Sequence, residues 1–218
     1  MQVATPAKVR RVVTVVLCAL VANCAGCSSS SRSNNAGITP TYDKTSGRLT
    51  ELAYDSNHNG KVDTWTEMNG SRPLRSRVDR NEDGRIDRWE YYDDRGQLTK
   101  VGFSRRDDGK ADAWAFVGAQ GRPLRIEISS IGDEKKIDRW EHYEGDELAS
   151  AEEDTNRDGK VDKWESYEAG ALEAVSFDED GDGKADRRLT YANGVLVAIE
   201  TEPADSGGFK TRVSVKPD

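Results

Sequence analysis

Short runs of alternating apolar and polar residues, separated by acidic or glycine-containing segments, extend from residue 45 to residue 201. Residues 88–92 (RWEYY) are rich in strand formers, residues 93–96 form a turn, and residues 97–103 (QLTKVGF) form a return strand. No helical period of useful length is present. The sequence therefore predicts an all-β fold, an antiparallel β-hairpin repeat array. Equivalent strands are expected at 47–54, 163–167, 172–177, 188–191 and 195–199.

The hairpins recur as repeats of about 24 residues. Aligned loop residues are Gly60, Gly84, Gly109, Lys135, Gly159 and Gly183, at intervals of 24, 25, 26, 24 and 24 residues. The dipeptides Asn69-Gly70 and Asn193-Gly194 predict type I′ turns, with positive φ at both residues. About a dozen strands exceed what an open twisted sheet usually tolerates, so we expect the array to coil, close or stack.

The loops that connect the hairpins fit the Ca²⁺-loop pattern D-x-[DN]-x-[DN]-G-x₅-E, fully in the second and fifth units. Ca²⁺ takes six to eight oxygen ligands, and alternate residues of a curled loop direct several oxygens at one centre. The first and sixth units lack the closing Glu, with Thr66 and Leu189 in its place. The predicted side-chain ligands are Asp79, Asn81, Asp83, Asp87 and Glu90; Asp154, Asn156, Asp158, Asp162 and Glu165; Asp55, Asn57, Asn59 and Asp63; and Asp178, Asp180, Asp182 and Asp186.

The third and fourth units are degenerate. The third has Ser104 at the first ligand position and Arg106 at the next, and a basic side chain there argues against Ca²⁺. The fourth, aligned from Ser130, has Lys135 where the glycine belongs. A metal-free alternative stays open for every loop, because Asx side chains and glycine form tight turns without a cation. Full and near matches in the same register make Ca²⁺ the favoured interpretation.

These loops resemble those of the EF-hand family, also used by dockerin-like and other D-x-D-x-D-G proteins. The resemblance covers about twelve residues in each loop and implies Ca²⁺ as the cofactor. It does not extend to the flanks, because an EF-hand has a helix on each side, whereas 98–103 and 164–167 are predicted strands. Only the ligand positions, and not the EF-hand fold or its opening, are therefore implied for this chain.

Five tryptophans occupy equivalent positions: Trp65, Trp89, Trp114, Trp140 and Trp164. A tryptophan repeated in every unit most often packs one unit on the next, and we expect that role. The alternative is a row of rings that stacks on sugars or choline. The run Trp89 to Leu98 (WEYYDDRGQL) is similar to choline-binding and related cell-wall-binding repeats, over the hairpin alone.

The N-terminus has the features of an export signal. A basic segment precedes the apolar run 12–21 (VVTVVLCALV), which is too short to span a bilayer. Ala25-Gly26-Cys27 followed by a serine run resembles a bacterial lipoprotein signal, which implies cleavage before Cys27 and diacylglycerol on its thiol. A plain secretory signal is the alternative. The expected organisation is a signal peptide at 1–26, a Ser/Asn-rich tether at 27–44, the repeat domain at 45–201, and a tail at 202–218 that adds one strand.

Charge and composition restrict the function. The net charge is −8, and removal of residues 1–26 leaves −11, which disfavours nucleic acid and anionic lipid as charge-bound partners and suits cations. We find no set of residues typical of an enzyme. The expected protein is a Ca²⁺-stabilised lipoprotein of the cell envelope, exposed outside the cytoplasm on the outer membrane or cell surface, with a structural or adhesive role. The alternatives are a module that binds cell-wall glycan, and a metal-free scaffold for another envelope protein.

Overall fold

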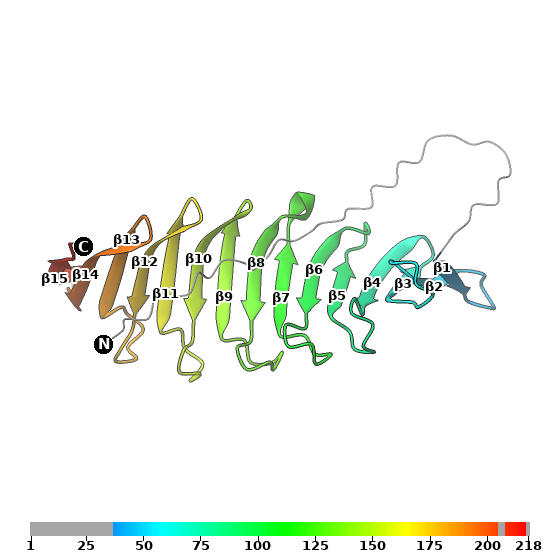
Figure 1. Cartoon of the computed structure of the whole chain (residues 1–218), viewed down its shortest axis with the longest axis horizontal. Coiled ribbons are helices and arrows are strands. Elements are labelled where there is room, and N and C mark those ends of the chain that lie inside the picture. The colour runs from blue at the N-terminus through cyan, green and yellow to red at the C-terminus, as the bar shows by residue number, and fades with distance from the viewer. Residues whose placement is uncertain (1–36, 205–207, 217–218) are drawn as a thin grey trace. The chain divides into compact units, whose positions relative to one another are not determined.

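A computed structural model describes residues 37–204 and 208–216 of the chain, and these residues form fifteen antiparallel strands in a single sheet. Each strand pairs with its neighbours in sequence, as Figure 1 shows. The predicted all-β hairpin array is confirmed. The strands are β1 Ile38–Tyr42, β2 Leu49–Tyr54, β3 Thr64–Asn69, β4 Arg72–Val78, β5 Arg88–Tyr92, β6 Leu98–Phe103, β7 Ala113–Val117, β8 Pro123–Ile128, β9 Arg139–Glu144, β10 Glu147–Glu153, β11 Lys163–Glu168, β12 Ala171–Phe177, β13 Arg187–Ala192, β14 Val195–Pro203 and β15 Phe209–Ser214.

The sheet is open, with β1 and β15 as its two edges. Closure and stacking, two of the three arrangements expected for so many strands, are therefore wrong for the described residues. Apart from the single 3₁₀ turn Ala119–Gly121, these residues contain no element outside the sheet. They also contain no helix long and apolar enough to cross a membrane. Strand β1 lies within the segment 27–44 assigned to the tether, so the sheet begins earlier than predicted.

Two-residue turns join the strands of several hairpins, and at one of them the turn type and position differ from the prediction. Asn193 and Gly194 both have positive φ, at 52° and 77°, as a type I′ turn requires. Asn69 instead belongs to β3, and the turn is Gly70-Ser71, with positive φ at Gly70 alone. That is the signature of a type II′ turn. The Asn-Gly signal thus located the hairpin correctly and misplaced the turn by one residue.

The register places the tryptophans in one row across the sheet. Trp89 lies opposite Gly102, which lies opposite Trp114, and the same alternation continues to Trp140 and Trp164. We call this side the Trp face. Gly102 leaves room for the neighbouring ring, because a Cβ there would lie 2.5 Å from Cζ3 of Trp114.

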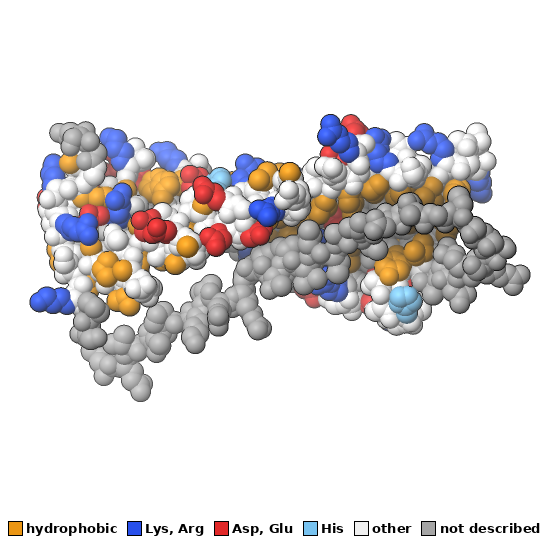
Figure 2. Space-filling view, turned by 90° about the horizontal axis from the view of Figure 1, so that it is seen from above, with side chains coloured by type: hydrophobic (Ala, Val, Ile, Leu, Met, Phe, Trp, Pro, Cys, Tyr) orange, Lys and Arg blue, Asp and Glu red, His pale blue; other side chains and the backbone are white. Residues whose placement is uncertain are grey.

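The opposite side, which we call the Val face, contains the small core. Val101, Ala115 and Ile126 are paired across β6, β7 and β8 and are 3%, 7% and 6% exposed. Phe103 and Tyr143 pack against them. Three glutamates, Glu90, Glu141 and Glu165, interrupt this row, which continues with the buried Ala151 and Val175. Neither face is therefore uniformly apolar, and neither requires a second sheet to cover it. In Figure 2, seen from the end that holds the hairpin turns, charged side chains of both signs lie among apolar ones.

Candidate metal sites

Six acidic loops follow the even-numbered strands β2 to β12 and therefore lie at the same end of the sheet (Figure 1). We number them loop 1 to loop 6 and count positions from the residue that follows the strand. The loops span residues 55–63, 79–87, 104–112, 129–138, 154–162 and 178–186.

The first and ninth positions hold the ends of a complete loop together. In loop 2, the carboxylate of Asp79 accepts hydrogen bonds from the backbone amides of Asp83 and Gly84, at 3.2 and 2.9 Å. Oδ2 of Asp87 accepts one from the amide of Arg80, at 2.6 Å. Loops 1 and 5 repeat this arrangement through their first and ninth residues. Gly84 has φ of +89°, a conformation that L side chains rarely adopt, and this permits the bend.

Loop 6 brings three carboxylates together. Asp178, Asp180 and Asp186 each have an oxygen within 4.8 Å of the others, the one group of three possible His, Cys, Asp or Glu metal ligands among residues 37–204 and 208–216. The amide of Asp182 donates to Oδ1 of Asp180, at 3.0 Å, and the amide of Glu179 donates to Oδ2 of Asp186, at 2.7 Å. Both oxygens of Asp178 accept hydrogen bonds from backbone amides, those of Gly181 and Gly183, at 2.7 Å each. The three carboxylates together form an oxygen donor set that could hold a metal ion.

Backbone amides favour the charged form of Asp178. Burial acts to raise the pKa of Asp178, but the amides of Gly183, Gly181, Asp182 and Asp180 hold it below its usual range. Asp182 also accepts a hydrogen bond from the amide of Lys184, at 2.8 Å. Loop 6 thus holds four aspartates within nine residues, and like charges so close together favour a bound cation.

The structure gives the predicted closing glutamates other partners. Glu90 lies on β5, where its carboxylate accepts hydrogen bonds from Arg88 and Tyr92 at 2.7 and 2.5 Å. Glu165 lies on β11 and contacts Arg139, Lys163 and Tyr167. Because residues two apart on a strand share a face, each glutamate is held on the Val face by its own strand neighbours. Metal ligation by Glu90 and Glu165 stays a prediction.

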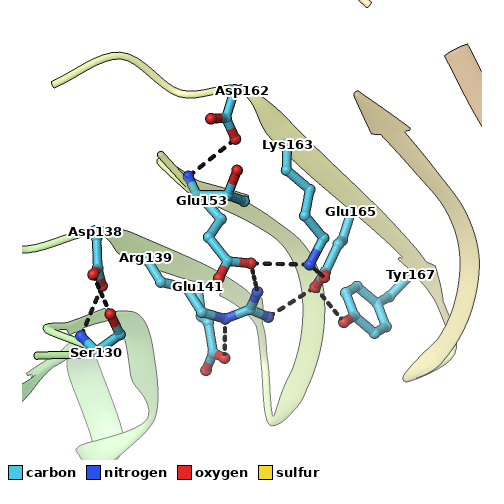
Figure 3. Close-up of polar contacts among 10 residues, drawn as sticks. Ser130, Asp138, Arg139, Glu141, Glu153, Asp162, Lys163, Glu165 and Tyr167 are labelled. Carbon is cyan, nitrogen blue, oxygen red and sulfur yellow. Dashed lines mark hydrogen bonds and ion pairs between the residues drawn. The ribbon is translucent and has the colours of Figure 1, made fainter. Parts of the chain in front are cut away.

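The glutamate on β11 belongs to an ion-pair network across three strands, drawn in Figure 3. Arg139 lies 3.0 Å from Glu141, 3.2 Å from Glu153 and 2.8 Å from Glu165. Lys163 joins Glu153 and Glu165, at 2.9 and 2.8 Å. Burial opposes ionisation of Glu165, but hydrogen bonds from Arg139, Lys163 and Tyr167 outweigh it and lower the pKa of that carboxyl to about 2.

Carboxylates at position 4 reach the preceding loop, a feature that the sequence analysis missed. Glu82 of loop 2 accepts hydrogen bonds from the side-chain amides of Asn57 and Asn59 in loop 1. Asp107 of loop 3 accepts two from Asn81 in loop 2, at 3.0 and 2.9 Å. The available signal was an acidic residue at position 4 in these two loops alone, and it gained meaning only when the strand pairing placed the loops side by side.

The contact between loops 2 and 3 also brings two carboxylates together. Burial raises the pKa of Asp87, and its contact with the carboxyl of Asp107 raises it further, against the amides of Arg80 and Asn81. A carboxyl pair of this kind either shares a proton or binds a cation. The remaining predicted ligands, Asp83, Asn156 and Asp158, lie within their own loops and accept hydrogen bonds from backbone amides two residues further on.

The fourth loop begins one residue earlier than its sequence alignment indicated. Ser129, and not Ser130, follows the strand, and its Oγ accepts a hydrogen bond from the amide of Asp133 at 3.0 Å. Asp133 in turn accepts one from Lys135, at 3.0 Å, as position 5 does in the other loops. The loop is one residue longer than its relatives, so Glu134 occupies the place of the glycine. An insertion that preserves both ends of a loop cannot be located from spacing alone.

A shallow cleft on the Trp face is a second candidate site. It has a volume of about 730 Å³ and is lined by Trp89, Tyr91 and Trp114 together with residues of loops 3 and 4. Nζ of Lys100 lies 3.9 Å from the centroid of the Trp114 ring, a cation–π contact that covers part of the ring. All five tryptophans are partly exposed, so the row is neither a buried core nor a set of fully exposed rings.

No family model matches the chain, and no curated protein matches it. Among solved structures it is similar to accessory secretory protein 1,2 and 3 in Streptococcus pneumoniae (TM-score 0.37, 17% identity, 49% of this chain and 19% of that one). It is also similar to TarM (TM-score 0.36, 11% identity, 44% and 18%) and to a GtfA/B complex bound to UDP and GlcNAc (TM-score 0.23, 11% identity, 60% and 21%). The chain spans about a fifth of the length of these structures.

Proposed function

We propose that the protein is a calcium-binding lipoprotein of the cell envelope, in which Ca²⁺ bound at the loops stabilises a β-sheet scaffold with a structural or adhesive role. The observation that carries this proposal is the convergence of Asp178, Asp180 and Asp186 in loop 6. Loops 1, 2 and 5 support it, because they repeat the same frame of hydrogen bonds and buried first-position aspartates. Oxygen-only donors suit a hard cation such as Ca²⁺.

In this proposal, loops 1 and 2 are completed from the neighbouring unit. Glu82 supplies a carboxylate to loop 1, which has Thr66 in place of the closing glutamate. Asp107 supplies one to loop 2, whose Glu90 is held on the sheet. A cation shared between adjacent loops fixes the distance between successive hairpins, so binding stabilises the array rather than opening a groove.

Isothermal titration of the full chain with CaCl₂ tests the metal proposal. Wild-type protein is expected to show saturable binding, and D180N is expected to lose the loop 6 site. D146N is the matched control, because Asp146 is an exposed residue in a hairpin turn at the opposite end of the sheet and removes the same charge. Equal loss of binding in D180N and D146N would show that the titration reports net charge and not the loop.

Membrane attachment rests on the sequence around Cys27, which lies outside the described residues. Two acyl chains on its N-terminal diacylglycerol would hold a very polar protein at a membrane, since each buried CH₂ contributes about 0.8 kcal/mol. The substitution C27A is expected to move the protein from the membrane fraction to the soluble fraction after cell lysis. Retention of C27A in the membrane would reject the lipid anchor.

The cleft on the Trp face favours a second function, the binding of a cell-wall glycan. Partly exposed Trp89 and Trp114 on either side of Gly102 offer ring faces of the kind that stack on sugars. Pull-down with purified peptidoglycan tests this function. W89A is expected to lose binding, and the control W65A, outside the cleft, is expected to retain it, with circular dichroism showing that both variants are folded.

A further inference from the structure

The last aspartate of each loop, at position 9 or, in the longer loop 4, at position 10, divides the loops into two classes. Among the described residues, Asp63, Asp87, Asp162 and Asp186 form no ion pair. Asp112 of loop 3 and Asp138 of loop 4 each face arginine side chains. The same two loops have serine at position 1, where the other four have aspartate. Loss of a first-position carboxylate and gain of a guanidinium therefore occur together.

The carboxylate of Asp112 is enclosed by arginines. Its side chain is 1% exposed, and it lies 3.6 Å from Nε of Arg105 and 3.9 Å from Nε of Arg106. Oδ1 accepts a hydrogen bond from the amide of Arg105, whereas Oδ2 has no hydrogen-bond partner among the described residues. A buried carboxylate oxygen in this situation depends on a nearby positive charge, and the guanidinium of Arg106 supplies it.

The carboxylate of Asp138 meets a guanidinium from the next unit. Arg157, at position 4 of loop 5, lies 3.4 Å from Oδ2 of Asp138 through Nε and donates to Oγ of Ser130 through Nη2, at 3.0 Å. Figure 3 shows the Ser130–Asp138 contact on which this arginine acts. Position 4 thus carries a carboxylate toward loops 1 and 2, and a guanidinium toward loop 4.

Arg106 also ties loop 3 to loop 4. Its guanidinium donates to the backbone carbonyls of Ser130 and Ile131. Gly132 provides the space, because a Cβ at that position would lie 2.7 Å from Nη1 of Arg106. The hydrophobic cluster of Val101, Ala115 and Ile126 lies on β6, β7 and β8. Loop 3 joins β6 to β7, and loop 4 follows β8.

We propose that guanidinium groups take the place of the bound cation in loops 3 and 4, so that the centre of the sheet is metal-independent and only its two ends respond to Ca²⁺. The metal response of the ends rests on the proposed function. Arginine stays protonated at every physiological pH, so the positive charge beside the carboxylates of loops 3 and 4 is permanent. In loops 1, 2, 5 and 6 the positive charge comes from bound Ca²⁺ and therefore depends on the Ca²⁺ concentration. A divalent cation is excluded from loops 3 and 4 by repulsion from the guanidinium.

Hydrogen exchange of the full chain tests this division. In EDTA, amides of 108–112 and 129–138 are expected to exchange more slowly than those of the four outer loops. CaCl₂ is expected to slow the outer loops and the part of loop 3 around Asp107, which contacts loop 2, but not these two segments. Slower exchange of 108–112 and 129–138 on adding Ca²⁺, to the same degree as the outer loops, would overturn the proposal. R157Q in EDTA is expected to speed the exchange of 129–138, and an unchanged wild-type rate in that segment would also overturn the proposal. These EDTA results do not depend on metal binding and separate this proposal from the proposed function.

A gain of binding is the second test. The double variant S104D/R106N restores the acidic pattern of loop 3 and is expected to bind one more Ca²⁺ than the wild type in isothermal titration. The control S104D/R95N makes the same change of charge and keeps Arg106, with the exposed Arg95 lying in a hairpin turn, and is expected to bind the wild-type number. Equal stoichiometry of all three proteins, each saturable, would reject the exclusion of metal by Arg106 while leaving the outer sites intact.

Discussion

The ion-pair network on the Val face makes a measurable contribution that depends on pH. Glu165 is 11% exposed and accepts contacts from Arg139 and Lys163, and its pKa falls from an ordinary value of 4.5 to about 2. A tenfold change in proton affinity corresponds to about 1.4 kcal/mol, so the ionised carboxylate stabilises the folded state by roughly 3 kcal/mol. Because the folded-state pKa is the lower one, this stabilisation is present above pH 4.5 and is lost as the pH falls toward 2.

The substitution E165Q removes the charge and keeps the shape of the side chain. At pH 7 in EDTA, we expect E165Q to lower the free energy of unfolding by about 2–3 kcal/mol, since Arg139 and Lys163 lose their best partner. The assay is urea unfolding followed by tryptophan fluorescence, at several pH values between 7 and 2.5. The difference between wild type and variant is expected to shrink steadily below pH 4.5.

The matched control is E168Q, at the exposed end of the same strand, where we expect a change within about 0.5 kcal/mol at every pH. A difference between wild type and E165Q that stayed constant from pH 7 to pH 2.5 would refute the assignment of the stabilisation to the ionised carboxylate. A difference below about 0.5 kcal/mol at pH 7 would show that desolvation cancels the ion pairs.

Three further substitutions probe the backbone and the loops. G84A is expected to cost about 1–2 kcal/mol in urea unfolding, because the residue has φ of +89° with no neighbour within 4 Å, so the cost is conformational alone. G102A is expected to cost about 1–3 kcal/mol and to shift the tryptophan emission, because the new methyl group would lie 2.5 Å from the ring of Trp114. E82Q is expected to weaken Ca²⁺ binding at loop 1, measured by titration. The control E179Q, at position 2 of loop 6, removes the same charge and is expected to leave binding at loop 1 unchanged.

Much of the fold follows from local sequence. The strand formers around Trp89 and Trp164 and the acidic segments between them fix the order, the direction and nearly all the limits of the hairpins. The tryptophans share one face although the units differ in length by up to two residues, because each tryptophan stands two residues after the last aspartate of the preceding loop and so takes the same place in its strand. The turn at Gly70-Ser71 was misplaced because Asn-Gly and Gly-Ser both satisfy a two-residue hairpin.

The candidate sites were less accessible from the sequence, because their completion depends on contacts between units. Spacing alone identifies the first, third, fifth and ninth positions of a loop, as for Asp79 and Asp87. It does not show that Glu90 contacts Arg88 on its own strand, or that Glu82 contacts Asn57 in the preceding loop. The role of Arg157 was equally hidden, since its partner Asp138 belongs to the preceding loop.

The central claim is that Ca²⁺ binds the folded loops and thereby stabilises the sheet. Thermal unfolding of the full chain, in EDTA and in increasing CaCl₂, tests it most directly, because a ligand that binds only the folded state stabilises it by about 2.7 kcal/mol for each site at a hundred times its Kd. The account predicts a Tm that rises with Ca²⁺ concentration and a rise that D180N reduces. An identical Tm in EDTA and in millimolar Ca²⁺ would contradict it.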